Sequence, residues 1–287
     1  MGPSWRELLA GNRPLVLPGA HDAFSARLIE DAGYSAYFIG GFPVIGARFA
    51  LPDIGLVGLG EMSASIRDIM RGSRLPVLVD IDDGYGDAKN VTRTIRIYEE
   101  MGASAVHMED QLAPKRCGHM AGKVLISVQD MEAKIRAAAA ARSSRDFFIV
   151  ARTDARDVDG LDAALRRGER YVEAGADGLF IESPRTVEEL EKIGRTFDVP
   201  LLANMLEGGV TPILSNRELG ELGFSMIIHG ITLLMRSARV MQETLADLKA
   251  DRLNPDKAGV AFAEYKRLVG FDDWAAIEDR FESKVSK

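Results

Sequence analysis

The hydrophobic pattern of the chain repeats one short unit, in which a helix-like stretch ends at a glycine and an apolar run follows. The unit occurs at residues 30–39, 99–108, 172–181 and 220–228. A glycine just past a helix end accepts the left-handed backbone that closes the helix. Short continuous apolar runs are typical of strands that are buried on both faces. The pattern therefore predicts helices that alternate with parallel strands.

Other apolar runs complete a set of eight expected strands. They lie near residues 16, 37, 78, 106, 149, 180, 202 and 227, and helical stretches such as Ala88–Met101 and Leu161–Ala174 separate them. This alternation predicts an α/β protein with a (β/α)8 TIM barrel. An open, doubly wound sheet is the alternative, although no Gly-x-Gly-x-x-Gly sequence follows the first expected strand.

The chain continues well beyond the eighth expected strand. Residues 233–249 and 259–282 have helical patterns, and Asn254-Pro255 lies between them. We expect residues 1–240 to form the barrel and residues 241–287 to form a C-terminal helical extension. This extension packs either on its own barrel or on a neighbouring subunit, through a stripe of large apolar residues: Phe271, Trp274 and Phe281.

Length and composition narrow the class of protein. The 287 residues fit one barrel of roughly 250 residues with a short extension. The net charge of −7 argues against a nucleic-acid partner, which favours a basic face. We expect no membrane span and no signal peptide, because no apolar run is long enough. The single cysteine excludes an intrachain disulfide and favours the reducing cytoplasm.

Polar residues gather where the expected strands end. In barrels of this kind the functional site lies at the C-terminal ends of the strands. Buried charges are costly unless they are paired or bind a metal, so this gathering indicates a site. The residues are Asp80, Asp82, His107, Glu109, Arg152, Glu182, Asn204 and His229.

Asp80 and Asp82 predict a metal site. They are two residues apart, a spacing that puts both carboxylates on one face of a strand. Such carboxylates repel each other unless a cation lies between them, and Glu109 is expected nearby. Oxygen ligands of this kind suit Mg²⁺ or Mn²⁺. An Asp-rich turn over residues 82–84 is the alternative interpretation.

One thiol lies among basic residues in the loop Lys115-Arg116-Cys117-Gly118-His119. Positive charge lowers the pKa of a thiol, and His119 is suited to share or relay its proton. Cys117 is then a proton donor, a proton acceptor or a nucleophile. Gly118 leaves room for the loop to close over a ligand. The alternative is a surface cysteine among solvated bases.

Arg152, at the end of the fifth expected strand, is the candidate to bind a carboxylate. Its planar guanidinium is suited to bidentate contact with that group. The alternative is a structural ion pair with Glu182 or Asp80.

Several of these motifs carry a resemblance over nearly the whole chain. Asp80–Gly86, Glu109–Gln111, the Cys117 loop, Ala151–Ala155 and Asn204–Gly209 resemble the isocitrate lyase/phosphoenolpyruvate mutase superfamily. The Cys-bearing motif is typical of its C–C lyase branch. In residues 118–123 and 204–209 the chain is more similar to dimethylmalate lyases than to methylisocitrate lyases.

The resemblance implies a Mg²⁺-dependent carbon–carbon lyase. Its substrate would be a 2-hydroxy-2-alkyl dicarboxylate of the 2,3-dimethylmalate or 2-methylisocitrate type, cleaved to pyruvate or a related 2-keto acid and a carboxylate. Oxaloacetate hydrolase and phosphonate mutase are the alternatives. The family also implies a homotetramer with C-terminal helices swapped between neighbours. The implied residues are Asp80, Asp82 and Glu109 for the metal; Cys117 as proton donor, His119, Arg152 and Asp53 for catalysis; and Gly40, Gly41, Phe42, Gly118, Arg152, Glu182, Asn204 and Arg236 for the substrate.

The end of the second expected strand departs from the family pattern. Phe38 stands where the family usually has Tyr. Gly40-Gly41 stands where the family usually has a Ser-Gly or Thr-Gly pair. Backbone N–H groups there still suit a carboxylate, but the side-chain oxygens are missing. The base that deprotonates the substrate hydroxyl therefore stays open.

Overall fold

The computed structural model describes residues 2–11, 14–118, 120, 122–252 and 259–281. They form two compact units, residues 1–235 and residues 236–287. The boundary falls inside one helix, α11 (Thr232–Lys249). The predicted division between residues 240 and 241 stays a prediction.

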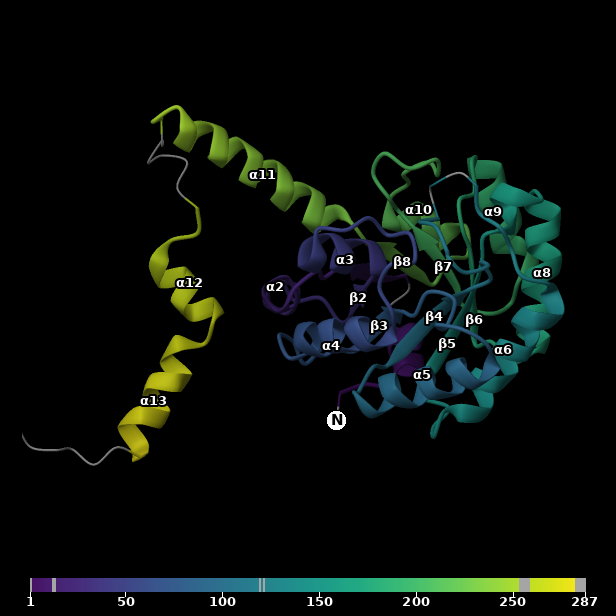
Figure 1. The fold of residues 1–287 in the computed structure, drawn as a ribbon, viewed down its shortest axis with the longest axis horizontal. Coiled ribbons are helices and arrows are strands. Elements are labelled where there is room, and N and C mark those ends of the chain that lie inside the picture. The colour runs from purple at the N-terminus through teal and green to yellow at the C-terminus, as the bar shows by residue number, and fades with distance from the viewer. Residues whose placement is uncertain (1, 12–13, 119, 121, 253–258, 282–287) are drawn as a thin grey trace, which may run out of the picture. The chain divides into compact units, whose positions relative to one another are not determined.

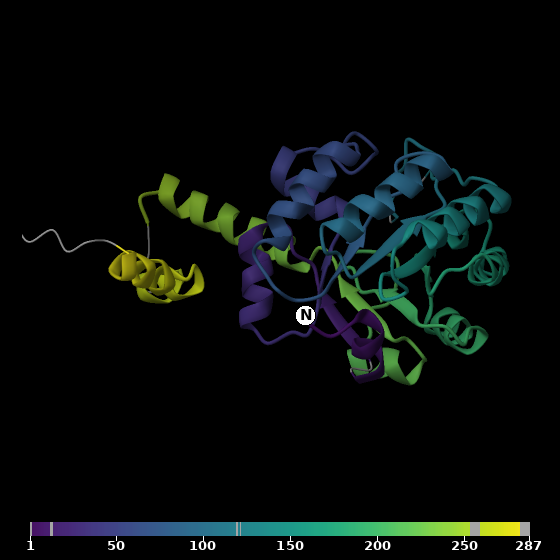
Figure 2. The same ribbon diagram turned by 90° about the horizontal axis from the view of Figure 1, so that it is seen from below.

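The first unit is an eight-stranded parallel barrel, which confirms the predicted fold (Figures 1 and 2). Seven neighbouring strand pairs have continuous parallel registers, and a bridge between Gly19 and Phe38 joins the first strand to the second. The strands are β1 Leu15–Pro18, β2 Tyr37–Ile39, β3 Val77–Asp80, β4 Ala105–Glu109, β5 Phe148–Thr153, β6 Gly178–Ile181, β7 Leu201–Asn204 and β8 Met226–His229.

Helices surround the strands and bury one face each. In α5 the buried residues Val91, Ile95 and Tyr98 recur at helical spacing, and the Asp87 side chain accepts hydrogen bonds from the first turn. The helices that lie within this unit are α1 Trp5–Gly11, α2 Ala23–Asp31, α3 Gly41–Phe49, α4 Leu59–Met70, α5 Ala88–Glu100, α6 Val128–Ala141, α7 Ala155–Val158, α8 Leu161–Glu173, α9 Val187–Thr196 and α10 Asn216–Glu221. Helix α11 begins in this unit and continues into the second.

The four helix–glycine–strand units lie where the sequence predicts them. Their glycines, Gly33, Gly102, Gly175 and Gly223, have φ angles between +81° and +111°, a backbone conformation that favours glycine. Each glycine ends a helix directly before a strand, so the predicted capping is confirmed.

Two apolar clusters hold the barrel together. The larger one lies between the strands and the outer helices. The smaller one fills the barrel with inward-facing strand residues, and α1 adds Trp5, Leu8 and Leu9 to it. Arg6 of the same helix donates a hydrogen bond of 3.1 Å to the carbonyl of Arg145, which precedes β5. Helix α1 therefore packs at the N-terminal ends of the strands.

The second unit contains the end of α11 and two short helices, α12 (Phe262–Leu268) and α13 (Phe271–Phe281). The prediction of one continuous helix over residues 259–282 is wrong. Gly270, with a φ of +69°, lies between the two helices and interrupts the helical backbone. Asn254-Pro255 lies outside the described residues. In the described part of the chain, no helix is long and apolar enough to cross a membrane.

Candidate active site

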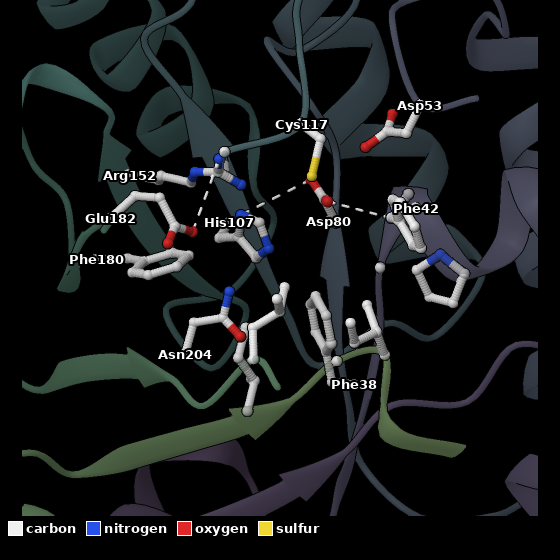
Figure 3. A pocket seen from close by; sticks show the side chains of 18 of the residues that line it. Phe38, Phe42, Asp53, Asp80, His107, Cys117, Arg152, Phe180, Glu182 and Asn204 are labelled. Atoms are coloured by element: carbon white, nitrogen blue, oxygen red, sulfur yellow. Dashed lines mark hydrogen bonds and ion pairs between the residues drawn. The ribbon is translucent and has the colours of Figure 1, made fainter. Parts of the chain in front are cut away.

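A pocket lies at the C-terminal ends of the strands, and every strand except β1, or the segment that follows it, contributes to its lining. It holds about 490 Å³ of space, part of it open solvent. Figure 3 shows Cys117, Arg152, Glu182 and Asn204 around this pocket. The predicted residues that line it are Gly40, Gly41, Phe42, Asp53, Asp80, His107, Cys117, Gly118, Arg152, Glu182 and Asn204.

Other predicted residues have different positions. Asp82 and Glu109 are buried next to the pocket lining. His119 lies outside the described residues, and Arg236 belongs to the second unit. Their predicted roles stay predictions. His229 is not among the lining residues, and its imidazole lies 3.5 Å from the side-chain amide of Asn216 on α10.

Asp80 and Asp82 lie close together, but for a different reason from the one predicted. Strand β3 ends at Asp80, and Asp82 has a φ of +49°, so the chain has already turned. The N–H of Asp82 donates to the Asp80 carboxylate at 3.0 Å, and the N–H of Glu109 donates to the Asp82 carbonyl at 2.9 Å. A turn fixed against β4, and not the pleat of a strand, brings the carboxylates together.

Three carboxylates converge next to Gly41. A Cβ atom on Gly41 would lie 3.3 Å from Asp82 Oδ1, 3.5 Å from Asp80 Oδ2 and 3.7 Å from Asp53 Oδ1. The N–H of Gly41 donates to Asp80 Oδ2 at 3.1 Å. A Cβ atom at this position would therefore be in contact with all three carboxylates, most tightly with Asp82.

Lys115 neutralises part of this cluster. Its buried ammonium group forms ion pairs with Asp53 and, at 2.6 Å, with Asp82. The sequence placed this lysine beside the thiol as a charge that lowers the thiol pKa. Its contacts are instead with carboxylates from the loop after α3 and the turn after β3.

Lys115 does not fully offset the negative charge of the buried carboxyl groups at this site. Burial, aided by Asp80 and Asp53, raises the pKa of Asp82 to about 7 despite the nearby Lys115. Burial also raises the pKa of Glu109 well above its usual range, although Arg152 opposes the change. One Glu109 oxygen, Oε1, is buried and has no hydrogen-bond partner among the described residues. Acidic groups under such conditions gain stability from an additional cation.

These residues fit a hard divalent cation. Carboxylate oxygens are the ligands that Mg²⁺ and Mn²⁺ prefer. Within the described ranges, no three His, Cys, Asp or Glu side chains are arranged to hold one ion directly. An ion held by Asp80 and Asp82 would therefore keep several water or substrate oxygens, as Mg²⁺ usually does.

Asp154 holds the Arg152 side chain in place by a bidentate contact. The Nε and Nη2 of Arg152 donate to the two oxygens of that carboxylate at 3.0 and 3.1 Å. Nη2 also lies 3.2 Å from Glu109 and 3.8 Å from Glu182. Burial opposes the charged guanidinium, but Asp154, Glu109 and Glu182 outweigh it and hold the pKa of Arg152 well above its usual range. The guanidinium therefore stays charged. Of the two ion pairs expected as an alternative, the one with Glu182 is present at 3.8 Å, and the shorter pairs are with Asp154 and Glu109. Together they hold a cation at the pocket.

Cys117 and Gly118 cross the pocket near Arg152. Cys117 is partly exposed, and both residues contribute to the lining. A Cβ atom on Gly118 would lie 2.4 Å from Arg152 Nη2 and 2.9 Å from Glu182 Cγ. The glycine was predicted to permit loop movement, but in the structure it permits the backbone to approach these two side chains.

Apolar residues form another part of the lining. The Phe38 ring stacks on His107 with centroids 5.5 Å apart, and Phe180 lies edge-on to the same imidazole at 5.7 Å. A Cβ atom on Gly40 would lie 2.8 Å from the Phe38 ring. The two departures from the family pattern are therefore spatially linked, because the ring lies beside the position of the missing side chain.

The comparisons with known proteins agree with this geometry. Residues 5–249 match the family model described as phosphoenolpyruvate phosphomutase. The chain belongs to this family. It is 40% identical to 2,3-dimethylmalate lyase of Eubacterium barkeri over 96% of both chains. It is also 40% identical to 2-methylisocitrate lyase of Aeropyrum pernix, over 98% of this chain and 90% of the relative.

A solved structure of oxaloacetate acetylhydrolase with the inhibitor 3,3-difluorooxalacetate has a TM-score of 0.92 to this chain. The two are 29% identical, and the match covers 98% of this chain and 97% of the other. The predicted superfamily and the predicted enzyme class are thus confirmed at the level of the family, whose named relatives include lyases.

Three buried residues of this phosphomutase-family site were missed by the sequence analysis as site residues: Lys115, Lys123 and Asp154. Asp154 follows Arg152 at a spacing of two, which on a continuous strand would put both side chains on one face, although β5 ends at Thr153. That spacing was a usable signal. Lys123 lies in a loop without regular periodicity, and only the folded chain brings it to Asp154, at 3.3 Å.

Proposed function

We propose that the protein is a Mg²⁺-dependent carbon–carbon lyase that acts on a 2-hydroxy-2-alkyl dicarboxylate. Its products would be pyruvate or a related 2-keto acid and a second carboxylate. One observation carries the proposal: the Cys117 thiol, the Arg152 guanidinium and the Asp80 carboxylate line the same pocket. A proton donor, an anion-binding group and a metal ligand are the groups that such a cleavage needs.

Arg152 is suited to bind a carboxylate of the substrate. Asp154 fixes two of its nitrogens, while Nη1 has no partner among the described residues. A charged, prealigned donor of this kind stabilises negative charge that develops on the leaving half. Arg152 therefore contributes most when the carbon–carbon bond breaks.

Asp80 and Asp82, with Glu109 through water, are the proposed metal ligands. When bound, the Mg²⁺ ion acts as a Lewis acid that lowers the pKa of the substrate hydroxyl. Of these residues Asp80 lines the pocket together with Gly40 and Gly41, so an ion held by its carboxylate would be within the candidate site. Mn²⁺ is an equally suitable ion on chemical grounds.

Cys117 is the proposed proton donor. As the hydroxyl loses its proton to a base, a carbonyl forms and the carbon–carbon bond breaks. The bonding electrons remain on the leaving carbon, which takes the proton of the Cys117 thiol. The Cys117 segment covers part of the pocket and so limits access of water to that carbon. His119 stays a predicted support for this step.

The test is an assay for pyruvate with 2,3-dimethylmalate and 2-methylisocitrate, with Mg²⁺ and with EDTA. We expect turnover that depends on the metal and that falls about 10²–10⁴-fold in Cys117→Ser, because the hydroxyl is a much weaker acid. Circular dichroism checks that the variant remains folded. Full activity in Cys117→Ser would remove the proton-donor role, and no turnover of either substrate would remove the proposed substrate class.

Hydrolysis of oxaloacetate is a second candidate. The chain is about as similar in fold to oxaloacetate acetylhydrolase, with a TM-score of 0.92, as to a solved 2,3-dimethylmalate lyase, with a TM-score of 0.90. An assay for oxalate, run in parallel with the pyruvate assay, separates the two reactions because only the hydrolase releases oxalate from oxaloacetate.

We also propose that the C-terminal helices pack on a second copy of the chain in a homotetramer. Phe262, Trp274 and Phe281 are 71–79% exposed in the single chain, and such a set of exposed aromatic residues is typical of an interaction surface. Light scattering on the wild type and on Trp274→Ser tests this, and we expect the variant to dissociate at higher concentration than the wild type. A monomeric wild type would contradict the proposal. The cytoplasmic location stays a prediction.

A further inference from the structure

Lys123 is a buried lysine beside the candidate site to which the mechanism above gives no role. Its side chain is 0% exposed, and its ammonium lies 3.3 Å from Asp154 Oδ1 and 3.4 Å from Asp157 Oδ2. It also donates a short hydrogen bond to the carbonyl of Gly118. A buried ammonium is rare unless it is paired, so these three oxygens explain its burial.

The contact with Gly118 links Lys123 to the thiol. Gly118 directly follows Cys117, and its carbonyl accepts a second hydrogen bond, of 3.2 Å, from the Ser183 hydroxyl after β6. The loop returns to the barrel where Leu112 N–H donates to the Val124 carbonyl at 2.7 Å. The backbone beside the thiol is therefore fastened to Ser183 directly and, through Lys123, to Asp154 and Asp157, which all lie outside the loop.

Asp154 connects this fastening to Arg152. Its Oδ1 lies near both Lys123 and Arg152 Nη2, and its Oδ2 accepts from Arg152 Nε. The N–H of Asp154 donates to Asp110 at 3.0 Å, which fixes the carboxylate at the end of β5. One carboxylate thus orients both the proposed anion-binding group and the lysine that holds the thiol segment.

We propose that Lys123 is a positioning residue, which holds Cys117 at the pocket by fastening the Gly118 carbonyl to Asp154 and Asp157. A lysine that only balanced the charge of Asp154 would need no contact with the loop backbone. Only the expected effect on turnover rests on the proposed lyase function. The contact between Lys123 and the Gly118 carbonyl is a property of the folded chain and can be tested without it.

The single cysteine makes the fastening measurable without any substrate. We compare the rate at which iodoacetamide alkylates Cys117 in the native wild type and in Lys123→Met, by intact-mass spectrometry. We expect alkylation to be about tenfold faster in the variant, which corresponds to about 1.4 kcal/mol of lost fastening. Lys192→Met is the matched control, because Lys192 is 53% exposed and pairs with Asp162 on the outer helices. It should react at the wild-type rate.

Equal rates in wild type and folded Lys123→Met would overturn the proposal, as would an equal acceleration in Lys192→Met. If Lys123→Met does not fold, Asp157→Asn is the deciding variant, because Asp157 is partly exposed and pairs with Lys123 and Arg185. We then expect a smaller acceleration, and an unchanged rate overturns the proposal.

A kinetic measurement tests the same role in the working enzyme. In folded Lys123→Met we expect kcat to fall about tenfold with KM within about twofold, because Asp154 still holds Arg152 while the proton donor is displaced. A rise in KM with unchanged kcat would contradict positioning of Cys117. If the wild type turns over none of the tested acids, the proposed function fails, and the alkylation result still decides the role of Lys123.

Discussion

Two layers of inward-facing side chains fill the barrel, and their chemistry differs although they lie only two residues apart on the same strands. Leu78 of β3 and Val150 of β5 belong to the apolar interior, while Asp80 and Arg152 line the pocket. The same change, from Ala105 to His107 and from Leu202 to Asn204, occurs on β4 and β7.

The difference separates stability from function within one structural element. The lower layer, closed by α1, removes apolar surface from water, which stabilises the fold. The upper layer buries charges, which is unfavourable unless they are paired or bind a ligand. Residues near the N-terminal ends of the strands therefore support the fold, and residues near the C-terminal ends are the ones proposed for the chemistry.

The largest effect on stability is expected at the lower layer. Leu8→Ala removes a side chain that is 4% exposed and leaves a cavity, so we expect a loss of about 2–5 kcal/mol. The same substitution at Leu56, which is 55% exposed, should cost no more than about 0.5 kcal/mol. Urea unfolding measures both, and equal losses would contradict the role given to α1. Turnover of folded Leu8→Ala should remain near that of the wild type.

A substitution in the upper layer should lower activity much more than stability. Arg152→Lys keeps the charge but loses the bidentate contact with Asp154, so we expect kcat/KM to fall about 10²–10³-fold with a small change in stability. Arg156→Lys is the control, because Arg156 pairs with Glu189 away from the pocket. Steady-state kinetics and thermal unfolding separate the effects. A variant that loses stability and activity together would show that the two layers are not separable.

The fold could be predicted from the sequence because the patterns that indicate it are local. Each expected strand was a short apolar run, and four helix ends carried a glycine whose positive φ the structure has. The exception, the break between α12 and α13, also depended on a glycine, Gly270, which the periodicity of the surrounding apolar residues concealed.

The candidate site could be predicted from the sequence only in part, because its polar contacts join segments that are far apart in the chain. Asp80, Arg152 and Asn204 could be found from their positions at strand ends. The partners of Lys115 and Lys123 could not, since each lysine pairs with a carboxylate more than 30 residues away in sequence. Asp82 was found for an incorrect reason, as a turn with a positive φ replaces the expected strand geometry.

A smaller effect, on pH dependence, sharpens the contrast between the layers. Burial raises the pKa of Asp82 to about 7, whereas the unfolded chain releases this proton near pH 4. Between these values the folded state binds more protons, so the free energy of unfolding falls as the pH rises. In EDTA we expect a decline of about 3 kcal/mol from pH 4.5 to pH 7.5. Mg²⁺ should reduce it by taking the place of the proton.

Two neighbouring substitutions decide whether the upper layer causes this decline. Asp82→Asn removes the titrating carboxyl and should flatten the pH profile measured in EDTA. Asp83→Asn is the matched control, because Asp83 pairs with Lys134 outside the pocket lining, and its profile should follow that of the wild type. The apolar lower layer contains no titrating group, so Leu8→Ala should shift the whole profile downward without changing its slope. A slope that persists in Asp82→Asn would assign the decline to another group, of which Glu109 is the first candidate because burial raises its pKa as well.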